Sequence, residues 1–133
     1  DLGGIGKGFA LDQLADYLEE WELSRALLHS GGSTVLALDA PKGAEGWKVG
    51  FGDEAGRESL WLTREAMSGS GTAVKGAHVL DPRTARPAET ESRTWARAPS
   101  AALADALSTA FMVFSPQEVD EYCREHPGIL AYR

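Results

Sequence analysis

An acidic residue and a hydroxyl residue lie four positions apart within one strongly apolar stretch of the chain. The stretch Pro99–Phe114 has hydrophobic residues at helical spacing on one face and further apolar residues on its other sides, which predicts a buried helix. Asp105 and Thr109 then project from the same face, one turn apart. A buried carboxylate requires an ion pair, hydrogen bonds or a cation, and hard cations such as Mg2+ prefer oxygen ligands. The pair therefore predicts a magnesium site; the alternative is an Asp105 held by an arginine or by backbone amides.

A histidine stands three residues before the sequence Asp81-Pro82. Residues His78–Leu80 are expected to end a strand, and Asp81-Pro82 to begin a turn, because Asp caps turns and Pro fixes the backbone angle that follows. This arrangement would place His78 and Asp81 near a common site, where an imidazole could accept a proton at neutral pH. The alternative is a histidine with a purely structural role.

The chain begins with a glycine-rich turn that opens a helix. The turn is no phosphate-binding P-loop, because Asp1 occupies the position of the first glycine of that motif and Gly8 follows Lys7. It is no dinucleotide fingerprint either, because Phe9 stands at the position of the third glycine. Backbone amides at such a turn can still bind an anion, and the alternative is a tight turn without a ligand.

Composition limits the class of protein. With 133 residues, of which 43% are hydrophobic and 25% charged, we expect one globular domain spanning residues 1–133. The formal net charge of -7, without a cluster of Lys or Arg, argues against nucleic-acid binding. The single Cys123 excludes an internal disulfide framework and a cysteine metal cluster, and no apolar run is long enough to span a bilayer.

Hydrophobic periodicity and turn residues predict the elements that must position these groups. The first helix should carry Phe9, Leu14, Leu18 and Trp21 on one face. The stretch Met67–Gly71 is interpreted as a loop. Residues Ser115 to Glu118 are interpreted as a capping box at the start of a helix. Antiparallel strands with helices on one side define an α+β domain. The predicted elements are helices over Lys7–Glu22, Pro99–Phe114 and from Ser115 to about His126, and strands over Arg25–Ser30, Ser33–Leu38, Trp47–Phe51, Ser59–Thr63, Arg93–Ala98 and Ile129–Arg133.

Four stretches in this order resemble the FAD:protein FMN transferases, the ApbE flavin transferase family, and the likeness runs along the whole chain. They are Asp1–Gly8 (DLGGIGKG), Ser30–Gly32 (SGG), His78–Thr84 (HVLDPRT) and Ala104–Thr109 (ADALST). The resemblance implies a T-fold-like α+β domain that corresponds to the C-terminal portion of a family member. It also implies a periplasmic or membrane-anchored lipoprotein setting, which the chain itself does not test.

The resemblance further implies a site for Mg2+ and for FAD as the substrate. The implied metal ligands are Asp105, Thr109 and the carbonyl of Gly4. The implied contacts to FAD come from Asp1, Lys7, His78 and Val79, and His78 is also the residue implied to activate the acceptor hydroxyl.

The reaction implied by the resemblance is Mg-dependent transfer of FMN from FAD to a Ser or Thr hydroxyl of a target protein, such as a flavinylated redox subunit, with release of AMP. Three residues depart from the family pattern. Ser33 replaces an acidic residue, Ala85 replaces the glycine after DPRT, and Ser108 stands where some members have an acidic ligand. Two alternatives therefore stay open, an FAD-binding protein without transferase activity and an Mg-dependent FAD pyrophosphatase.

Overall fold

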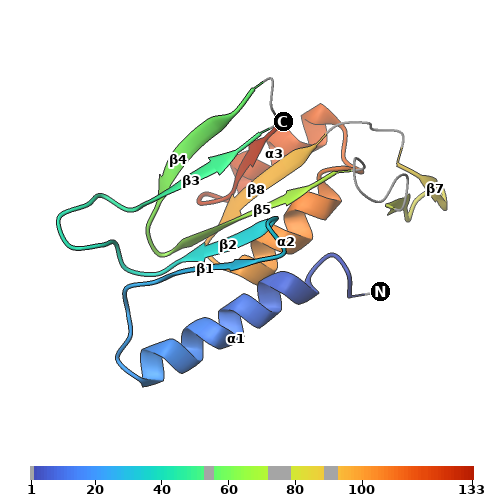
Figure 1. The fold of residues 1–133 in the computed structure, drawn as a ribbon. Coiled ribbons are helices and arrows are strands. Elements are labelled where there is room, and N and C mark those ends of the chain that lie inside the picture. Colours follow the sequence, from blue (N-terminus) through green and yellow to red (C-terminus); the bar gives the residue numbers. More distant parts are fainter. Residues whose placement is uncertain (1, 53–55, 72–78, 89–92) are drawn as a thin grey trace.

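The computed structural model describes residues 2–52, 56–71, 79–88 and 93–133. Figure 1 shows a twisted central sheet with helices on one face and a long β-hairpin on the other. The elements are α1 (Gly6–Glu20), β1 (Leu27–Ser30), β2 (Thr34–Ala37), β3 (Trp47–Phe51), β4 (Glu58–Leu62), β5 (Glu65–Ser70), β6 (Leu80–Asp81), β7 (Arg86–Pro87), β8 (Thr94–Ala98), α2 (Ala101–Ala110), α3 (Pro116–Glu125) and β9 (Leu130–Tyr132).

The central sheet has five strands in the order β1-β2-β5-β8-β9, and every neighbouring pair is antiparallel. Helices α1 and α2 lie against one of its faces, and the β3–β4 hairpin lies over the other (Figure 1). A small separate hairpin is formed by β6 and β7. The predicted α+β class is confirmed. Within the described ranges, no helix combines the length and apolar character needed to cross a bilayer.

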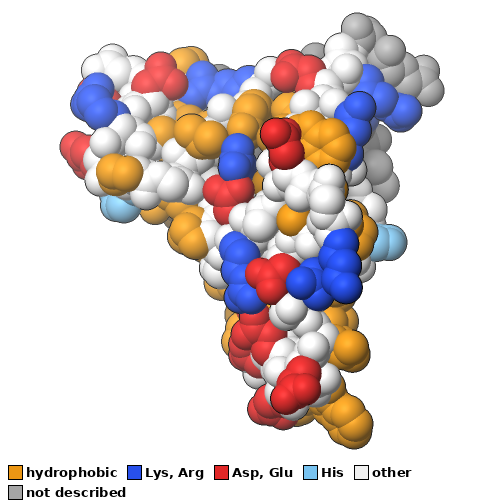
Figure 2. All heavy atoms as spheres, turned by 90° about the vertical axis from the view of Figure 1, so that its left-hand side faces the viewer, with side chains coloured by type: hydrophobic (Ala, Val, Ile, Leu, Met, Phe, Trp, Pro, Cys, Tyr) orange, Lys and Arg blue, Asp and Glu red, His pale blue; other side chains and the backbone are white. Residues whose placement is uncertain are grey.

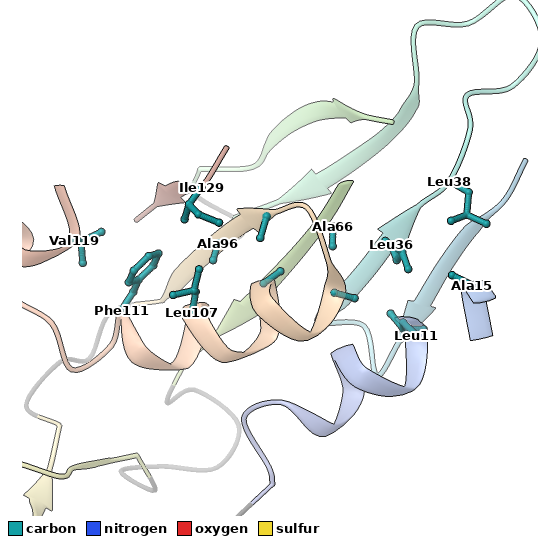
Figure 3. Close-up of a cluster of buried hydrophobic side chains, with 13 residues drawn as sticks. Leu11, Ala15, Leu36, Leu38, Ala66, Ala96, Leu107, Phe111, Val119 and Ile129 are labelled. Carbon is teal, nitrogen blue, oxygen red and sulfur yellow. The ribbon is translucent and has the colours of Figure 1, made fainter. Parts of the chain in front are cut away.

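Alternation along the strands gives the sheet two apolar faces. Leu36, Ala66 and Ala96 contribute to the larger core beneath α2, together with Leu107 and Phe111 of the α2 segment (Figure 3). The residues next to these in sequence point the other way and form a second core under the hairpin, which contains Ala37, Leu62 and Met67 with Trp47 and Trp95 packed against them. Both faces are covered, so the sheet is held in place from two sides.

The predicted apolar face of α1 is only in part the face that packs inward, because Leu18 packs against the core whereas Phe9, Leu14 and Trp21 are exposed. Phe9 is 58% exposed and Trp21 78% exposed, whereas Gly8, Leu11 and Ala15 are buried. Gly8 explains the difference, because a methyl group added there would lie 2.1 Å from the carbonyl oxygen of Ala101. The two helix backbones approach so closely that the small side of α1 must face α2. Leu11 packs inward with this side, whereas Phe9, Leu14, Tyr17 and Trp21 are exposed. Figure 2 shows hydrophobic and acidic side chains side by side on the lower lobe of the molecule.

The interpretation of Met67–Gly71 as a loop was also wrong, because β5 lies at the centre of the sheet. Small residues are needed there for packing. A methyl group at Gly69 would lie 2.7 Å from the indole ring of Trp95 on the neighbouring strand. The lack of bulky residues therefore reflects close packing on both faces of a central strand.

The other elements agree with the predictions within a few residues. The predicted helix over Pro99–Phe114 contains α2, which has Ser100 as its N-cap and ends at Ala110. The capping box of Ser115 and Glu118 is confirmed at the start of α3. The predicted strand at His78–Leu80 is present only as the two-residue β6, and His78 lies outside the described residues.

The contact between the helices predicts opposite effects for two glycines of α1. We expect Gly8→Ala to lower the free energy of unfolding by roughly 1–3 kcal/mol, because the added methyl group meets α2 backbone. Gly6→Ala is the matched control, since no heavy atom lies within 4 Å of the added methyl group. That substitution should raise stability slightly through helix propensity. Urea unfolding followed by circular dichroism measures both, and equal effects of the two changes would contradict the close-contact explanation.

Candidate functional site

The sheet face beneath α2 changes from apolar to hydroxyl-bearing toward one end. On this face, Leu36 of β2 and Ala66 of β5 pair with each other, whereas two positions along the same strands Thr34 pairs with Ser68. Farther along β5, Ser70 pairs with Thr94 of β8. Thr34 and Ser68 are fully buried, so their hydroxyl groups need partners within the protein.

Helix α2 places Asp105 directly over these hydroxyls. Asp105 is only 1% exposed. Its Oδ1 accepts hydrogen bonds from Thr34 Oγ1 at 3.3 Å and from Ser68 Oγ at 3.1 Å. Its Oδ2 accepts one from the backbone amide of Gly8 at 3.0 Å. A buried carboxylate is thus solvated by protein dipoles from two strands and a second helix, which is what such a group requires.

Helix α1 also supplies a positive charge to this carboxylate. Lys7 Nζ lies 3.1 Å from Asp105 Oδ1, and the Lys7 side chain is 36% exposed whereas that of Asp105 is 2% exposed. The alternative considered from the sequence, a carboxylate held by an arginine or by amides, is realised in part. One backbone amide does bind Asp105, and its cationic partner among the described residues is a lysine.

The two helices cap each other through their carboxylates. Gly8 is the third residue of α1, so its amide has no partner within the helix, and Ile5 provides no side-chain cap. Asp105 of α2 fills that role. In return, the carboxylate of Asp12 in α1 accepts hydrogen bonds at 2.8 Å from the amides of Ala101 and Ala102, which begin α2. Each acidic side chain also complements the positive end of the other helix.

Thr109 extends the cluster by one helical turn. Its Oγ1 lies 3.1 Å from Ser70 Oγ and 3.4 Å from the carbonyl oxygen of Asp105. Ser108 Oγ lies 2.9 Å from Ser70 Oγ and also donates to that carbonyl at 2.9 Å. A methyl group added at Gly4 would lie 3.2 Å from Thr109 Oγ1, so the glycine-rich turn packs directly on this threonine.

The resulting group of oxygen atoms contains a single carboxylate. Among the described residues, no three side chains of His, Cys, Asp or Glu come together as a metal-binding group. The other oxygen atoms that could bind a metal belong to hydroxyls and backbone carbonyls. In the described part of the chain, no buried side-chain nitrogen or oxygen lacks a hydrogen-bond partner. Such a cluster can interact with a small hard cation or with a phosphate-bearing ligand accompanied by one, and is unsuited to a soft metal.

The predicted turn at Asp81-Pro82 is confirmed, and an arginine connects it to the end of α2. Asp81 accepts hydrogen bonds from the side chain and the backbone amide of Arg83, and these lower the pKa of Asp81. The Arg83 guanidinium also donates to the carbonyl of Val113 at 2.8 Å and to Glu118 at 2.9 Å. The pKa of Glu118 is lowered, mainly by a hydrogen bond from the backbone amide of Ser115. The turn is thereby attached to the segment between α2 and α3.

The structure brings together four of the residues predicted for the site: Gly4, Lys7, Asp105 and Thr109. Val79 belongs to a different segment from these four residues, just before β6. Its carbonyl accepts a hydrogen bond from the amide of Ala88 at 2.8 Å. Asp1 and His78 lie outside the described residues.

Sequence reasoning missed Thr34, Ser68 and Ser70 as partners of the helix. A signal was present, because Ser68 and Ser70 are two residues apart, the spacing of one face of a strand. The misassigned loop at Met67–Gly71 concealed it.

The chain matches the family model described as "ApbE family" over residues 1–133. It is 31% identical over 150 aligned residues to the FAD:protein FMN transferase of Escherichia coli strain K12, covering 99% of this chain and 41% of that protein. It is 29% identical over 151 residues to the FAD:protein FMN transferase of Treponema pallidum, covering 97% of this chain and 41% of that protein. The chain thus spans less than half the length of these curated relatives.

Solved structures show the same fold. The apo form of the flavinyl transferase ApbE of Pseudomonas stutzeri superposes with a TM-score of 0.84 at 26% identity, covering 98% of this chain and 44% of that one. The ApbE protein of Thermotoga maritima superposes with a TM-score of 0.82 at 28% identity, covering 98% of this chain and 47% of that one.

The buried hydroxyls predict a stability cost that exposed hydroxyls do not share. Thr34→Val keeps the shape of the side chain and removes one of the donors to Asp105, so we expect it to lower the free energy of unfolding by about 1–3 kcal/mol. Thr63→Val is the control, because the Thr63 hydroxyl bonds the carbonyl of Glu45 at an exposed position. Its cost should stay near 0.5 kcal/mol, roughly the lower limit for a single hydrogen bond. Urea unfolding decides, and a larger loss at Thr63 would contradict the network.

The turn after Asp81 predicts that one substitution stabilises the protein. Ala85 has φ of 55°, in the left-handed region that disfavours any residue with a Cβ. Ala85→Gly should therefore raise the free energy of unfolding by up to about 1 kcal/mol. Ala44→Gly, at an exposed position without a positive φ, should lower it because glycine adds freedom to the unfolded chain. Thermal unfolding of both variants is the measurement, and a loss at Ala85 would show that the turn is not strained.

Proposed function

The chain belongs to the ApbE family, and from this premise we propose that it forms part of an enzyme that transfers FMN from FAD to a Ser or Thr hydroxyl of a target protein. The observation that carries the proposal is that Lys7 and Gly8, at the start of α1, contact Asp105 of α2, while Gly4 of the preceding turn packs on Thr109. The names of the relatives, FAD:protein FMN transferase, support FAD as the substrate and a protein as the acceptor. Dependence on Mg2+ and release of AMP are part of the same proposal.

The residues at Asp105 fit a magnesium ion. The donors are oxygens, as Mg2+ requires, and Oδ1 of Asp105 already faces a positive charge, the Lys7 ammonium. Gly4 packs on Thr109 without a side chain between them. We therefore propose Asp105, Thr109 and the Gly4 carbonyl as the protein ligands. When bound there, the ion would neutralise charge on the diphosphate and polarise the phosphorus–oxygen bond to be broken.

The chain's own residues would hold FAD around this point. Lys7 provides a positive charge 3.1 Å from Asp105, and the half-buried Val79 before β6 would contact the flavin. Asp1 is proposed as a further contact by family resemblance. Phosphoryl transfer depends mainly on alignment and charge neutralisation, so groups fixed by a rigid helix pair suit it well.

The proposed reaction conserves atoms through one substitution at phosphorus. The acceptor hydroxyl oxygen forms a bond to the phosphorus on the FMN side of FAD, and the bond from that phosphorus to the bridging oxygen breaks. AMP leaves with the bridging oxygen, and FMN remains on the target as a phosphoester. His78 is proposed to accept the hydroxyl proton, a role that imidazole performs near neutral pH.

We expect the natural full-length protein, incubated with FAD, MgCl2 and a purified acceptor that a family member flavinylates, to increase the mass of the acceptor by one FMN group. AMP should appear in equal amount, because each transfer releases one AMP. Asp105→Asn should slow the reaction by roughly 100-fold or more. Asp120→Asn, at an exposed residue of α3, is the matched control and should leave the rate unchanged. Intact-mass spectrometry of the acceptor and chromatography of nucleotides are the measurements.

The same experiment separates the alternatives. Free FMN and AMP in equal amounts, lost on addition of EDTA and without any change in acceptor mass, would identify an Mg-dependent FAD pyrophosphatase. Bound FAD that stays intact would identify an FAD-binding protein without transferase activity, which the departures at Ser33 and Ala85 would then explain. Either result would overturn the transfer proposal.

A further inference from the structure

Polar and charged partners from the described residues already surround Oδ1 of Asp105. Three donors converge on Oδ1, the hydroxyls of Thr34 and Ser68 and the ammonium of Lys7, the last at 3.1 Å. The two hydroxyls belong to adjacent strands at the centre of the sheet and are fully buried, so they are fixed in place. Lys7 is the only one of the three that lies on a long flexible side chain and reaches solvent.

We infer that Lys7 serves as a built-in substitute cation, which fills the cation position at Asp105 and must leave before a divalent ion can bind there. This inference rests on the proposed function, because it concerns the same metal position. Two positive charges cannot share one carboxylate oxygen without strong repulsion, so the ammonium and a divalent ion compete. The released ammonium is then available to the FAD diphosphate. Metal binding and substrate binding are coupled through this one side chain.

The surroundings of Lys7 permit the exchange. A methyl group added at Gly31 would lie 3.5 Å from Lys7 Cδ, so the turn between β1 and β2 borders the aliphatic part of the lysine. Gly31 and Gly32 both have positive φ, at 61° and 68°, and neither carries a side chain that could obstruct the path to solvent. The glycine pair thus serves a second purpose beside turning the chain, since it leaves room for Lys7 to move.

A substitute cation also explains how Asp105 stays buried as an anion in the absence of metal. Without Lys7, the carboxylate would keep two hydroxyls and one amide but lose its only formal counter-charge among the described contacts. An unpaired buried charge destabilises the folded state. Removal of the ammonium should therefore make the folded state depend on an added cation.

The test is titration of the natural full-length protein with MgCl2 in the absence of FAD, followed by calorimetry and by the melting temperature. Lys7→Met removes the charge and keeps the length of the side chain. We expect it to bind Mg2+ roughly threefold to tenfold more tightly than wild type, because the competitor is gone. Its melting temperature without metal should be lower than that of wild type, and MgCl2 should raise it by a larger amount.

Two further variants serve as controls. Lys48→Met removes the same charge at an exposed position of β3, and should leave Mg2+ affinity at the wild-type value. Lys7→Arg keeps the charge, and should bind Mg2+ no more tightly than wild type. FAD binding, measured by flavin fluorescence with MgCl2 present, should weaken in Lys7→Met and remain unchanged in Lys48→Met.

The outcomes separate this inference from the function on which it rests. If Asp105→Asn abolishes Mg2+ binding but Lys7→Met binds Mg2+ as wild type does, the metal site stands and the substitute-cation role of Lys7 is wrong. If Mg2+ binds equally to wild type and Asp105→Asn, the metal position itself is wrong, and both proposals fail. Tighter Mg2+ binding in both Lys7→Met and Lys48→Met would show that the loss of any positive charge has the same effect. That result would also overturn the role of Lys7.

Discussion

Helices α1 and α2 cap each other's N-termini with carboxylate side chains, and this reciprocal capping is the constraint on which the site depends. Asp12 binds the first amides of α2, and Asp105 binds an early amide of α1, so neither helix can rotate or slide without exposing unpaired backbone donors. The close approach at Gly8 adds a steric limit to the same pair. Position and orientation of Asp105 are therefore consequences of helix packing, and the chemistry of the site uses a geometry that the fold already requires.

The sheet contributes an equally specific surface. Strands β2 and β5 carry Leu36 and Ala66 where the core is apolar, and Thr34 and Ser68 two residues away where the carboxylate lies. Because hydroxyls are small and can donate, they solvate Asp105 without the volume or charge of longer polar residues. One face of one sheet thus serves as core packing over part of its length and as the floor of a polar site over the rest.

Asp105 has a structural role and a proposed chemical role at once, and the two are compatible. Its Oδ2 is occupied by the amide of Gly8, whereas its Oδ1 side includes the partly exposed Lys7. In the proposed exchange, Oδ2 would keep the helices together while Oδ1 changes its cationic partner. The chain covers 41% of its Escherichia coli relative. In the described part, acidic side chains and exposed apolar side chains of α1 lie at the surface (Figure 2).

Local sequence was enough to determine the features that depend on neighbours in the chain. These are the helical spacing of Asp105 and Thr109, the capping box at Ser115, the turn at Asp81 and the β1–β2 hairpin, because hydrogen bonds within a few residues specify each of them. Tertiary structure decided which groups meet Asp105, since Ser68, Thr34 and Gly8 are 37, 71 and 97 positions away in the chain. It also decided which side of α1 is buried, because that choice follows from backbone contact at Gly8 and cannot be read from hydrophobicity alone.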